Sequence, residues 1–408
     1  MNNIISKSLQ IGVLSLSLCL NAQAMEAAEK STAISPWLYK QLSKSEKLIG
    51  KQAYSEARAK LLKILPELDN NSYEQAITLR SLASVYALEN QYQKSAKLLE
   101  QALATNALTA DLQQQTLLNL GQLYMATEQY QKAVDTLDPW LKKSPDTKNI
   151  PVRVLLANAY TQLKKYRKAL PYIEYAVKHS KQPNESWLQL NLALHYQLEN
   201  YSAAADILRM LVAQYPDKKD YWQQLASVYL QIQQYTNALT VKQMAYKKGY
   251  IRSESEILQL FNLFLYNKQP YQGATLLSKE LESRNVKQNS QNWEILANAW
   301  TLAREYKQAI NALEKASALH PEGELYLQLG RIHVEQDMWP AAISAINKAL
   351  EKGGLKQTGE AYILLGMSYY ETGQLKSAEN TFKKAMSYSK TKKSAAQWLN
   401  YIAVDTNS

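Results

Sequence analysis

The sequence predicts an all-α solenoid of about ten helix-turn-helix units that ends in a capping helix. Two marks, an aromatic residue and a small residue three positions later, recur every 33 to 38 residues along the chain. A chance amphipathic helix would not keep both this period and this phase. The 408 residues include only 12 glycines and 11 prolines, a scarcity that favours long helices with short connections over an all-β fold.

Residues 1–24 are predicted to be a secretory signal peptide that is not part of the fold. Lys7 precedes an apolar run from Leu9 to Leu20, which is too short to span a bilayer. An A-x-A cleavage signal follows and ends at Ala24, so Met25 is the expected new N-terminus. We therefore expect a periplasmic protein with no integral membrane segment after signal cleavage.

Cys19, the only cysteine, leaves a second way of processing open. Leu16 stands three residues before it, as in lipoprotein signals, but Leu18 stands directly before it, where a small side chain is expected. We favour cleavage after Ala24, with a lipoprotein attached at Cys19 as the alternative. Cleavage after Ala24 removes the single thiol and one lysine, which lowers the formal net charge from +11 to +10.

The mature chain divides into an N-terminal segment (25–37), the repeat array (38–392) and a capping helix with a tail (393–408). The stretch 117–145 illustrates one repeat, a pair of helices that Pro145 ends. Its predicted core residues recur at helical spacing: Leu120, Gly121, Tyr124, Ala133, Leu137 and Trp140.

The same marks identify the other repeats. The second helix of each begins with an aromatic mark: Tyr54, Tyr92, Tyr130, Tyr166, Tyr201, Tyr235, Tyr271, Tyr306 and Trp339, with Leu375 in the last repeat. Three positions later comes its small mark: Ala57, Ser95, Ala133, Ala169, Ala204, Ala238, Ala274, Ala309, Ala342 and Ala378. Small residues at both helices of a pair let the two helices approach closely.

The first helices carry matching marks. Their small marks are Ala83, Gly121, Ala157, Ala193, Ala226, Ala297, Gly330 and Gly366. An aromatic residue follows three positions later: Tyr86, Tyr124, Tyr160, Tyr196, Tyr229, Trp300 and Tyr369, with His333 in the ninth repeat. We expect these residues to be core, because the aromatic ring fills the wedge beside the two small residues.

Three repeats depart from the pattern. The first has Ser45 and Leu48 at the first-helix marks, as terminal repeats are often atypical. The fifth is one residue short between Tyr196 and Tyr201. The seventh has Phe261 and Phe264 at the first-helix marks and one extra residue before Tyr271, which predicts a local change of packing. The last helix, 394–404, places apolar residues on one face to cover the tenth repeat: Ala395, Trp398, Leu399 and Ile402.

Positive charge is concentrated between Leu141 and Glu185, where the sequence has ten lysines or arginines and only three acids. The densest part is a basic patch, Lys164, Lys165, Arg167 and Lys168. Such a patch could attract anionic lipid, glycan or an acidic protein, or it could only make the outer face of the helices soluble. No nucleic-acid-binding module is present, so we expect no nucleic acid partner.

Motifs for catalysis are absent. The four histidines, His179, His195, His320 and His333, are far apart, and neither H-E-x-x-H nor G-x-S-x-G occurs. Gly353-Gly354 is not followed by the Lys-Ser/Thr of a phosphate loop. We predict that the chain is not an enzyme and that it uses no cofactor or metal.

From about residue 38 to residue 390, the pattern L-G-x-x-Y, then a small residue, then proline resembles tetratricopeptide repeat proteins. This resemblance implies a right-handed superhelix of antiparallel helix pairs whose first helices line a concave groove. Members of the family mostly act as scaffolds, and many bind an extended peptide or a partner helix in that groove.

Transferring the family's groove positions to this sequence gives a row of mostly neutral side chains. The candidate groove residues are Asn119, Gln122, Asn158, Asn191, Gln224, Ser227, Gln259, Asn262, Asn298 and Arg331. Side-chain amides donate and accept hydrogen bonds, so they suit the backbone of an extended peptide. The alternative is a solvated face whose amides bind nothing.

The family's carboxylate clamp, which grips a peptide C-terminus, is not reproduced. Arg80, Ser84 and Asn119 match its beginning, but Pro151 and Leu155 stand where its later basic residues belong. The resemblance therefore does not extend to capture of a C-terminus in the way of chaperone-binding relatives.

Three segments of the distal half, 215–222, 292–300 and 350–356, are similar to periplasmic tetratricopeptide proteins found beside TonB–ExbB–ExbD systems. That similarity implies an accessory of proton-motive-force-driven uptake across the outer membrane, with a protein of that system or another envelope protein as partner. The alternative hypothesis is an envelope assembly factor that binds glycan or anionic lipid through the basic patch.

Overall fold

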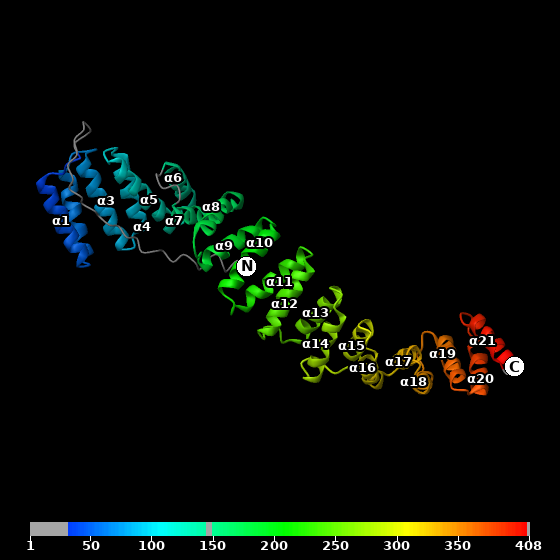
Figure 1. Ribbon diagram of the computed structural model, residues 1–408. Coiled ribbons are helices and arrows are strands. Elements are labelled where there is room, and N and C mark those ends of the chain that lie inside the picture. The colour runs from blue at the N-terminus through cyan, green and yellow to red at the C-terminus, as the bar shows by residue number, and fades with distance from the viewer. Residues whose placement is uncertain (1–31, 144–148, 406–408) are drawn as a thin grey trace. The chain divides into compact units, whose positions relative to one another are not determined.

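The computed structural model describes residues 32–143 and 149–405, and Figure 1 draws them as coiled ribbons. These ranges contain 21 α-helices, one short 3₁₀ turn (Leu65–Glu67) and no strand. The fold is an all-α tetratricopeptide-type solenoid, as predicted. The predicted signal peptide with Cys19, and Pro145 at the end of the third repeat, lie outside the described residues. None of the described helices is long and apolar enough to cross a membrane.

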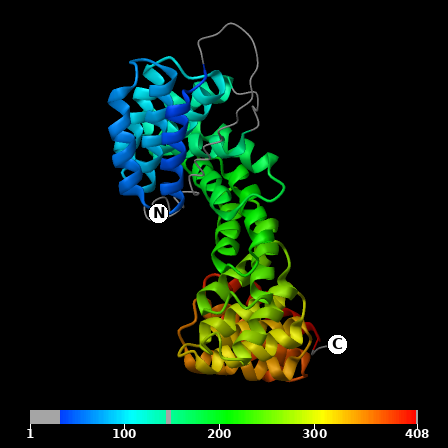
Figure 2. The same cartoon turned by 90° about the vertical axis from the view of Figure 1, so that its left-hand side faces the viewer.

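The chain divides after Pro216 into two compact halves. The first half holds five helix pairs: α1 (Pro36–Gly50) with α2 (Tyr54–Ile64), α3 (Tyr73–Leu88) with α4 (Tyr92–Ala104), α5 (Ala110–Ala126) with α6 (Tyr130–Lys143), α7 (Ile150–Gln162) with α8 (Tyr166–His179), and α9 (Glu185–Gln197) with α10 (Tyr201–Gln214). Its helices stand side by side (Figure 2), and each from α2 to α10 packs on the one before it in the chain.

The second half holds five more pairs and the final helix: α11 (Lys219–Gln231) with α12 (Tyr235–Lys247), α13 (Glu254–Tyr266) with α14 (Pro270–Glu282), α15 (Ser290–Leu302) with α16 (Tyr306–Leu319), α17 (Glu324–Glu335) with α18 (Trp339–Lys352), α19 (Thr358–Glu371) with α20 (Leu375–Ala385), and α21 (Lys392–Asp405). Within this half, each helix from α12 to α21 packs on the one before it. The last, α21, caps the array, because its Trp398 ring stacks on Phe382 of α20 with centroids 5.4 Å apart.

One backbone turn joins the two helices of every repeat. The residue two positions before the second helix has a left-handed conformation, for example Gln233 with φ 59° and Gly373 with φ 74°. The next residue donates its N–H to the carbonyl of the first-helix aromatic mark, as Gln234 does to Tyr229 at 2.8 Å. Glycine fills the left-handed position only at Gly373, so the other nine repeats hold a non-glycine residue there.

This turn corrects the register predicted for the fifth repeat. There the N–H of Asn200 bonds to the carbonyl of His195 at 2.9 Å, so His195 and not Tyr196 occupies the aromatic mark. The small mark shifts with it, from Ala193 to Leu192. Burial agrees, because Leu192 and His195 are buried while Tyr196 is only half-buried. The predicted register was wrong because a small and an aromatic residue stand one place beyond the true marks. The backbone hydrogen bonds identify the turn.

The seventh repeat is corrected in the same way. Its second helix begins at Pro270, and Gln269 donates its N–H to the carbonyl of Phe264 at 2.9 Å. The second-helix small mark is therefore Gly273 and not Ala274, and the turn has no extra residue. After both corrections the two small marks lie 12 residues apart in all ten repeats, from Ser45 and Ala57 in the first repeat onward.

Candidate partner-binding surface

Most of the candidate groove residues lie on accessible faces of the first helices. Five are exposed: Gln224, Ser227, Gln259, Asn262 and Asn298. Four are half-buried: Asn119, Gln122, Asn158 and Arg331. Some first helices of neighbouring repeats touch one another: α1 touches α3, α5 touches α7 and α7 touches α9 in the first half, and α17 touches α19 in the second. The sequence therefore brings polar side chains into a row along these helices.

Asn191 does not belong to this row, and its prediction was wrong. The register of the fifth repeat places Asn191 directly before the small mark, where other repeats have a core leucine such as Leu120 or Leu225. The side chain is 2 % exposed, and its Oδ1 has no hydrogen-bond partner. A partner on the surface cannot reach this amide.

Several of the remaining side chains already have partners within the protein. Asn158 donates to the carbonyl of Val154 in its own helix at 2.9 Å. Asn298 accepts a hydrogen bond from Gln328 of the next-but-one helix at 2.7 Å. Arg331 pairs with Glu360 at 3.1 Å, so its charge is neutralised. These contacts leave Gln224, Ser227 and Asn262 as the exposed polar groups without a hydrogen bond in the described part of the chain.

The basic patch forms as one cluster at the turn that starts α8. All four side chains are exposed, and Lys165 donates to the amide oxygen of Gln131 at 2.8 Å. Lys164 holds the left-handed position of the turn with φ 56°. Positive charge at the N-terminus of a helix opposes the helix dipole, so the patch does not stabilise α8.

The histidines do not form a site. His195 and His333 are buried at the aromatic marks of the fifth and ninth repeats, and Nδ1 of each lacks a hydrogen-bond partner. His179 stacks on Tyr175 with ring centroids 3.8 Å apart. Across the described ranges, no group of three histidine, cysteine or acidic residues is placed to hold a metal ion.

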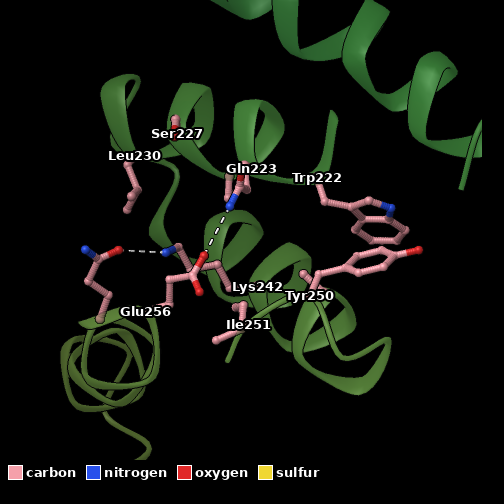
Figure 3. A pocket seen from close by; sticks show the side chains of 11 residues that line it. Trp222, Gln223, Ser227, Leu230, Lys242, Tyr250, Ile251 and Glu256 are labelled. Carbon is pink, nitrogen blue, oxygen red and sulfur yellow. Dashed lines mark hydrogen bonds between the residues drawn. The ribbon is translucent and has the colours of Figure 1, made fainter. Parts of the chain in front are cut away.

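Sequence reasoning missed a pocket in the sixth repeat. This cavity of about 310 Å³ lies between α11 and α13, with α12 behind it. Figure 3 shows its side chains, with the rings of Trp222 and Tyr250 lying beside one another on one side. Its polar lining comes from α11, α12 and α13: Gln223, Ser227, Lys242, Glu256 and Gln259. Ser227 and Gln259, two of the candidate groove residues, thus line this cavity.

Lys242 occupies a position that is otherwise core. In three repeats the residue four places after the second-helix small mark lies against the first-helix small mark, as Leu137 lies against Gly121. In the nine repeats other than the sixth, this residue is apolar and at most 2 % exposed: Leu61, Leu99, Leu137, Ile173, Leu208, Leu277, Leu313, Ile346 and Phe382. Lys242 is half-buried, and its Nζ donates to Oε1 of Gln259 at 3.0 Å. Burial lowers the pKa of Lys242, and the charge of Glu256 offsets part of that shift.

Glu256 is held firmly as a carboxylate. It forms a capping box with Ser253, accepts from Nε2 of Gln223 at 3.1 Å and lies 3.4 Å from Nζ of Lys219. Burial raises the pKa of Glu256, but these hydrogen bonds and two from backbone N–H groups outweigh it and lower the pKa to about 2. The one signal in the sequence for this pocket was the lysine at a core position.

Family models match most of the repeat array. The model described as Psidin, N-terminal TPR repeats region, matches residues 120–252. Two models described as tetratricopeptide repeat match residues 359–392 and residues 80–147 and 299–354. No curated protein matches the chain significantly.

Solved structures align with parts of the chain at low identity. A crystal structure of MamA protein is 21 % identical, with a TM-score of 0.34, and the alignment covers 43 % of this chain and 94 % of that one. A tetratricopeptide repeat protein from Parabacteroides merdae is 17 % identical, with a TM-score of 0.30, over 62 % of this chain and 98 % of that one.

A third structure is the C-terminal part of a TPR repeat-containing protein from Cytophaga hutchinsonii. It is 14 % identical, with a TM-score of 0.39, and the alignment covers 69 % of this chain and 95 % of that one. The family follows from the family models together with the ten helix pairs and their common turn. The chain is a tetratricopeptide repeat protein, a member of a family whose proteins bind protein partners.

Proposed function

We propose that the protein is a periplasmic scaffold that binds a segment of a partner protein along its first helices and serves a TonB-dependent uptake system. The observation that carries the binding role is the accessible polar row on the first helices, above all Gln224, Ser227 and Asn262. These groups face outward and have no hydrogen bond within the described residues.

The chemistry of this row suits peptide backbone. A primary amide offers two N–H donors and a carbonyl acceptor, which match the alternating C=O and N–H groups of an extended chain. Each such bond contributes only about 0.5–1.5 kcal/mol, so a partner needs several repeats to bind firmly. The row extends over successive first helices, which supplies that number.

The proposed periplasmic location and the proposed TonB role rest on the sequence. An apolar run from Leu9 to Leu20 and the cleavage signal that ends at Ala24 support export, and the segments 215–222, 292–300 and 350–356 support the TonB system. A protein of that system, for example TonB itself or a receptor that TonB energises, is the partner we propose.

Site-specific photo-crosslinking in the cell envelope tests both parts. A photoreactive residue at Asn262 of α13 should capture the partner, whereas the same residue at the exposed Thr275 of α14 should not. Equal capture at both positions would contradict binding on the first helices. Capture at Asn262 of a protein outside the uptake system would leave the scaffold role and remove the TonB assignment.

The exposed basic patch favours a second candidate, an envelope assembly factor that binds anionic lipid or glycan. Four cations gather at one turn where they oppose the dipole of α8. Binding to vesicles of phosphatidylglycerol, compared with phosphatidylcholine, should fall when Lys164, Lys165, Arg167 and Lys168 are all changed to glutamine. Unchanged binding of that variant would end this candidate.

A further inference from the structure

The lysine of the sixth repeat lies where the fold calls for an apolar side chain. Nine repeats fill this position with leucine, isoleucine or phenylalanine, each at most 2 % exposed. A half-buried ammonium there loses hydration and packs less well than leucine. Departures from an otherwise uniform pattern that lower stability are typical of functional positions. Lys242 therefore needs an explanation outside the packing of the repeat.

Within the described residues Lys242 forms no ion pair, although the charge of Glu256 acts on it from the same pocket. Its one hydrogen bond within the described residues goes to the neutral amide of Gln259, which leaves two of its three N–H donors unused. Glu256 lines the same pocket, but its oxygens receive hydrogen bonds from Ser253, Gln223 and two backbone N–H groups and lie beside Lys219. The ammonium group of Lys242 can thus donate hydrogen bonds to an acceptor on a partner molecule.

The surroundings favour an anionic acceptor. From residue 217 to residue 259 the chain has six lysines or arginines and four acids, a local excess of two positive charges. Since Glu256 is neutralised by Lys219, the charge left at the pocket is that of Lys242. A carboxylate is the anionic group that a protein partner carries, and a single ammonium pairs with it as a point charge.

The cavity also has room for the group that bears the carboxylate. Its volume of about 310 Å³ exceeds that of a carboxylate alone. Trp222 and Tyr250 form an aromatic side of the pocket, against which the methylene groups of an acidic residue can pack (Figure 3). Ser227 and Gln259, which line the cavity, lie on the accessible faces of α11 and α13, so the pocket opens onto the polar row.

We propose that the pocket of the sixth repeat binds a carboxylate of the partner segment, with Lys242 as the residue that contacts it. This inference rests on the proposed function, because it takes the ligand to be a peptide on the first helices. The carboxylate belongs either to an aspartate or glutamate side chain or to the C-terminus of the segment. Lys242 comes from a second helix, so the pocket is distinct from the clamp whose later basic positions are Pro151 and Leu155 here.

A synthetic library of short random peptides, made with free and with amidated C-termini, tests the proposal on the full mature chain. Wild-type protein should enrich peptides with aspartate or glutamate at one fixed place, or with a free C-terminus, and the two outcomes distinguish the sources. Lys242→Met should weaken binding of the enriched peptides at least about tenfold, as expected for loss of a hydrogen bond to a charged group.

Lys247→Met is the matched control, since Lys247 is an exposed lysine of the same helix and does not line the pocket. It should change binding less than about twofold, because an exposed charge away from the pocket contributes little. Lys242→Met should keep its helical circular dichroism and melt no lower than wild type, because the position accepts apolar residues in other repeats.

The outcomes separate the two hypotheses. Enriched peptides that bind Lys242→Met as tightly as wild type, or that carry no carboxylate at all, would overturn the pocket and leave partner binding on the first helices intact. A library from which wild-type protein enriches nothing would contradict both. Loss of binding in Lys247→Met equal to that in Lys242→Met would also overturn the pocket, since any nearby positive charge would then suffice.

Discussion

Gly273 of α14 lies directly beneath Phe261 of α13. A Cβ atom on Gly273 would stand 3.5 Å from Cδ2 of Phe261 and 3.0 Å from Cβ of Phe264. Phe261 is 1 % exposed at the first-helix small mark, where seven of the other nine repeats have alanine or glycine. The seventh repeat therefore exchanges the usual sizes, with a large residue on the first helix and no side chain on the second.

Gly273→Ala should destabilise the C-terminal half. The added methyl group is too close to Phe264 to fit without a shift, and overpacking of a dense core costs about 1–3 kcal/mol. Denaturant unfolding followed by circular dichroism measures the change. The double variant Phe261→Ala, Gly273→Ala restores the sizes found in other repeats. The space left by the ring of Phe261 lets the new methyl group move away from Phe264, so the loss in the double variant should be smaller than the sum of the two single losses. Additive losses would show that the two residues do not compensate each other.

This pair also shows how far the sequence predicts the fold. Ten repeats, the all-α class and the capping helix follow from the period of the marks, and the structure confirms them. The register of two repeats was wrong because small and aromatic residues happen to stand one place beyond the true marks, at Ala193, Tyr196 and Ala274. Only the constant turn, which depends on backbone conformation, places the marks at Leu192, His195 and Gly273.

Lys242→Leu should stabilise the protein. Leucine is the commonest residue at this position in the other repeats, and full burial of a leucine side chain contributes about 1.5–3 kcal/mol. The lysine methylenes already contribute part of that burial, so we expect a gain of about 1–2 kcal/mol in urea unfolding. Lys247→Leu should change stability by less than about 0.5 kcal/mol. A loss in Lys242→Leu would mean that the lysine is a structural element of the repeat.

The candidate site was less predictable than the fold. Nine of the ten predicted groove residues lie on accessible first-helix faces, because helical periodicity determines which way a residue points. Whether an amide is available to bind a partner depends on side-chain contacts such as that between Gln328 and Asn298. A repeat pattern does not encode such contacts. The pocket escaped notice because Lys242 became unusual only when the position was compared across correctly aligned repeats.

Two glycines with open surroundings should respond to alanine in opposite directions. An added Cβ would meet nothing within 4 Å at either Gly50 or Gly373, but Gly373 has φ 74°. Gly373→Ala should cost about 1–2 kcal/mol, since an L-residue is strained in the left-handed region. Gly50→Ala should add up to about 0.5 kcal/mol, because alanine loses less backbone entropy in a helix and Gly50 is the last residue of α1. Thermal melts compare the two variants, and changes of the same sign would refute the explanation from backbone conformation.

The buried histidines should make stability fall in mild acid. Burial lowers the pKa of His195 and of His333, while Glu174 and Asp206 near the former and Glu314 near the latter offset part of the shift. Each imidazole is therefore neutral in the folded protein over a range where the unfolded chain, with its ordinary pKa of 6.5, takes up a proton.

The unfolded state binds more protons than the folded state at mildly acidic pH. The free energy of unfolding therefore has its full value above pH 6.5 and declines as the pH falls below it. Replacing both residues by phenylalanine, which keeps an aromatic ring at each mark, should flatten this part of the profile. Urea unfolding of wild type and double variant at a series of pH values measures the difference, in which carboxylates common to both proteins cancel. Parallel profiles between pH 6.5 and the onset of acid unfolding would show that neither histidine is buried as a neutral ring.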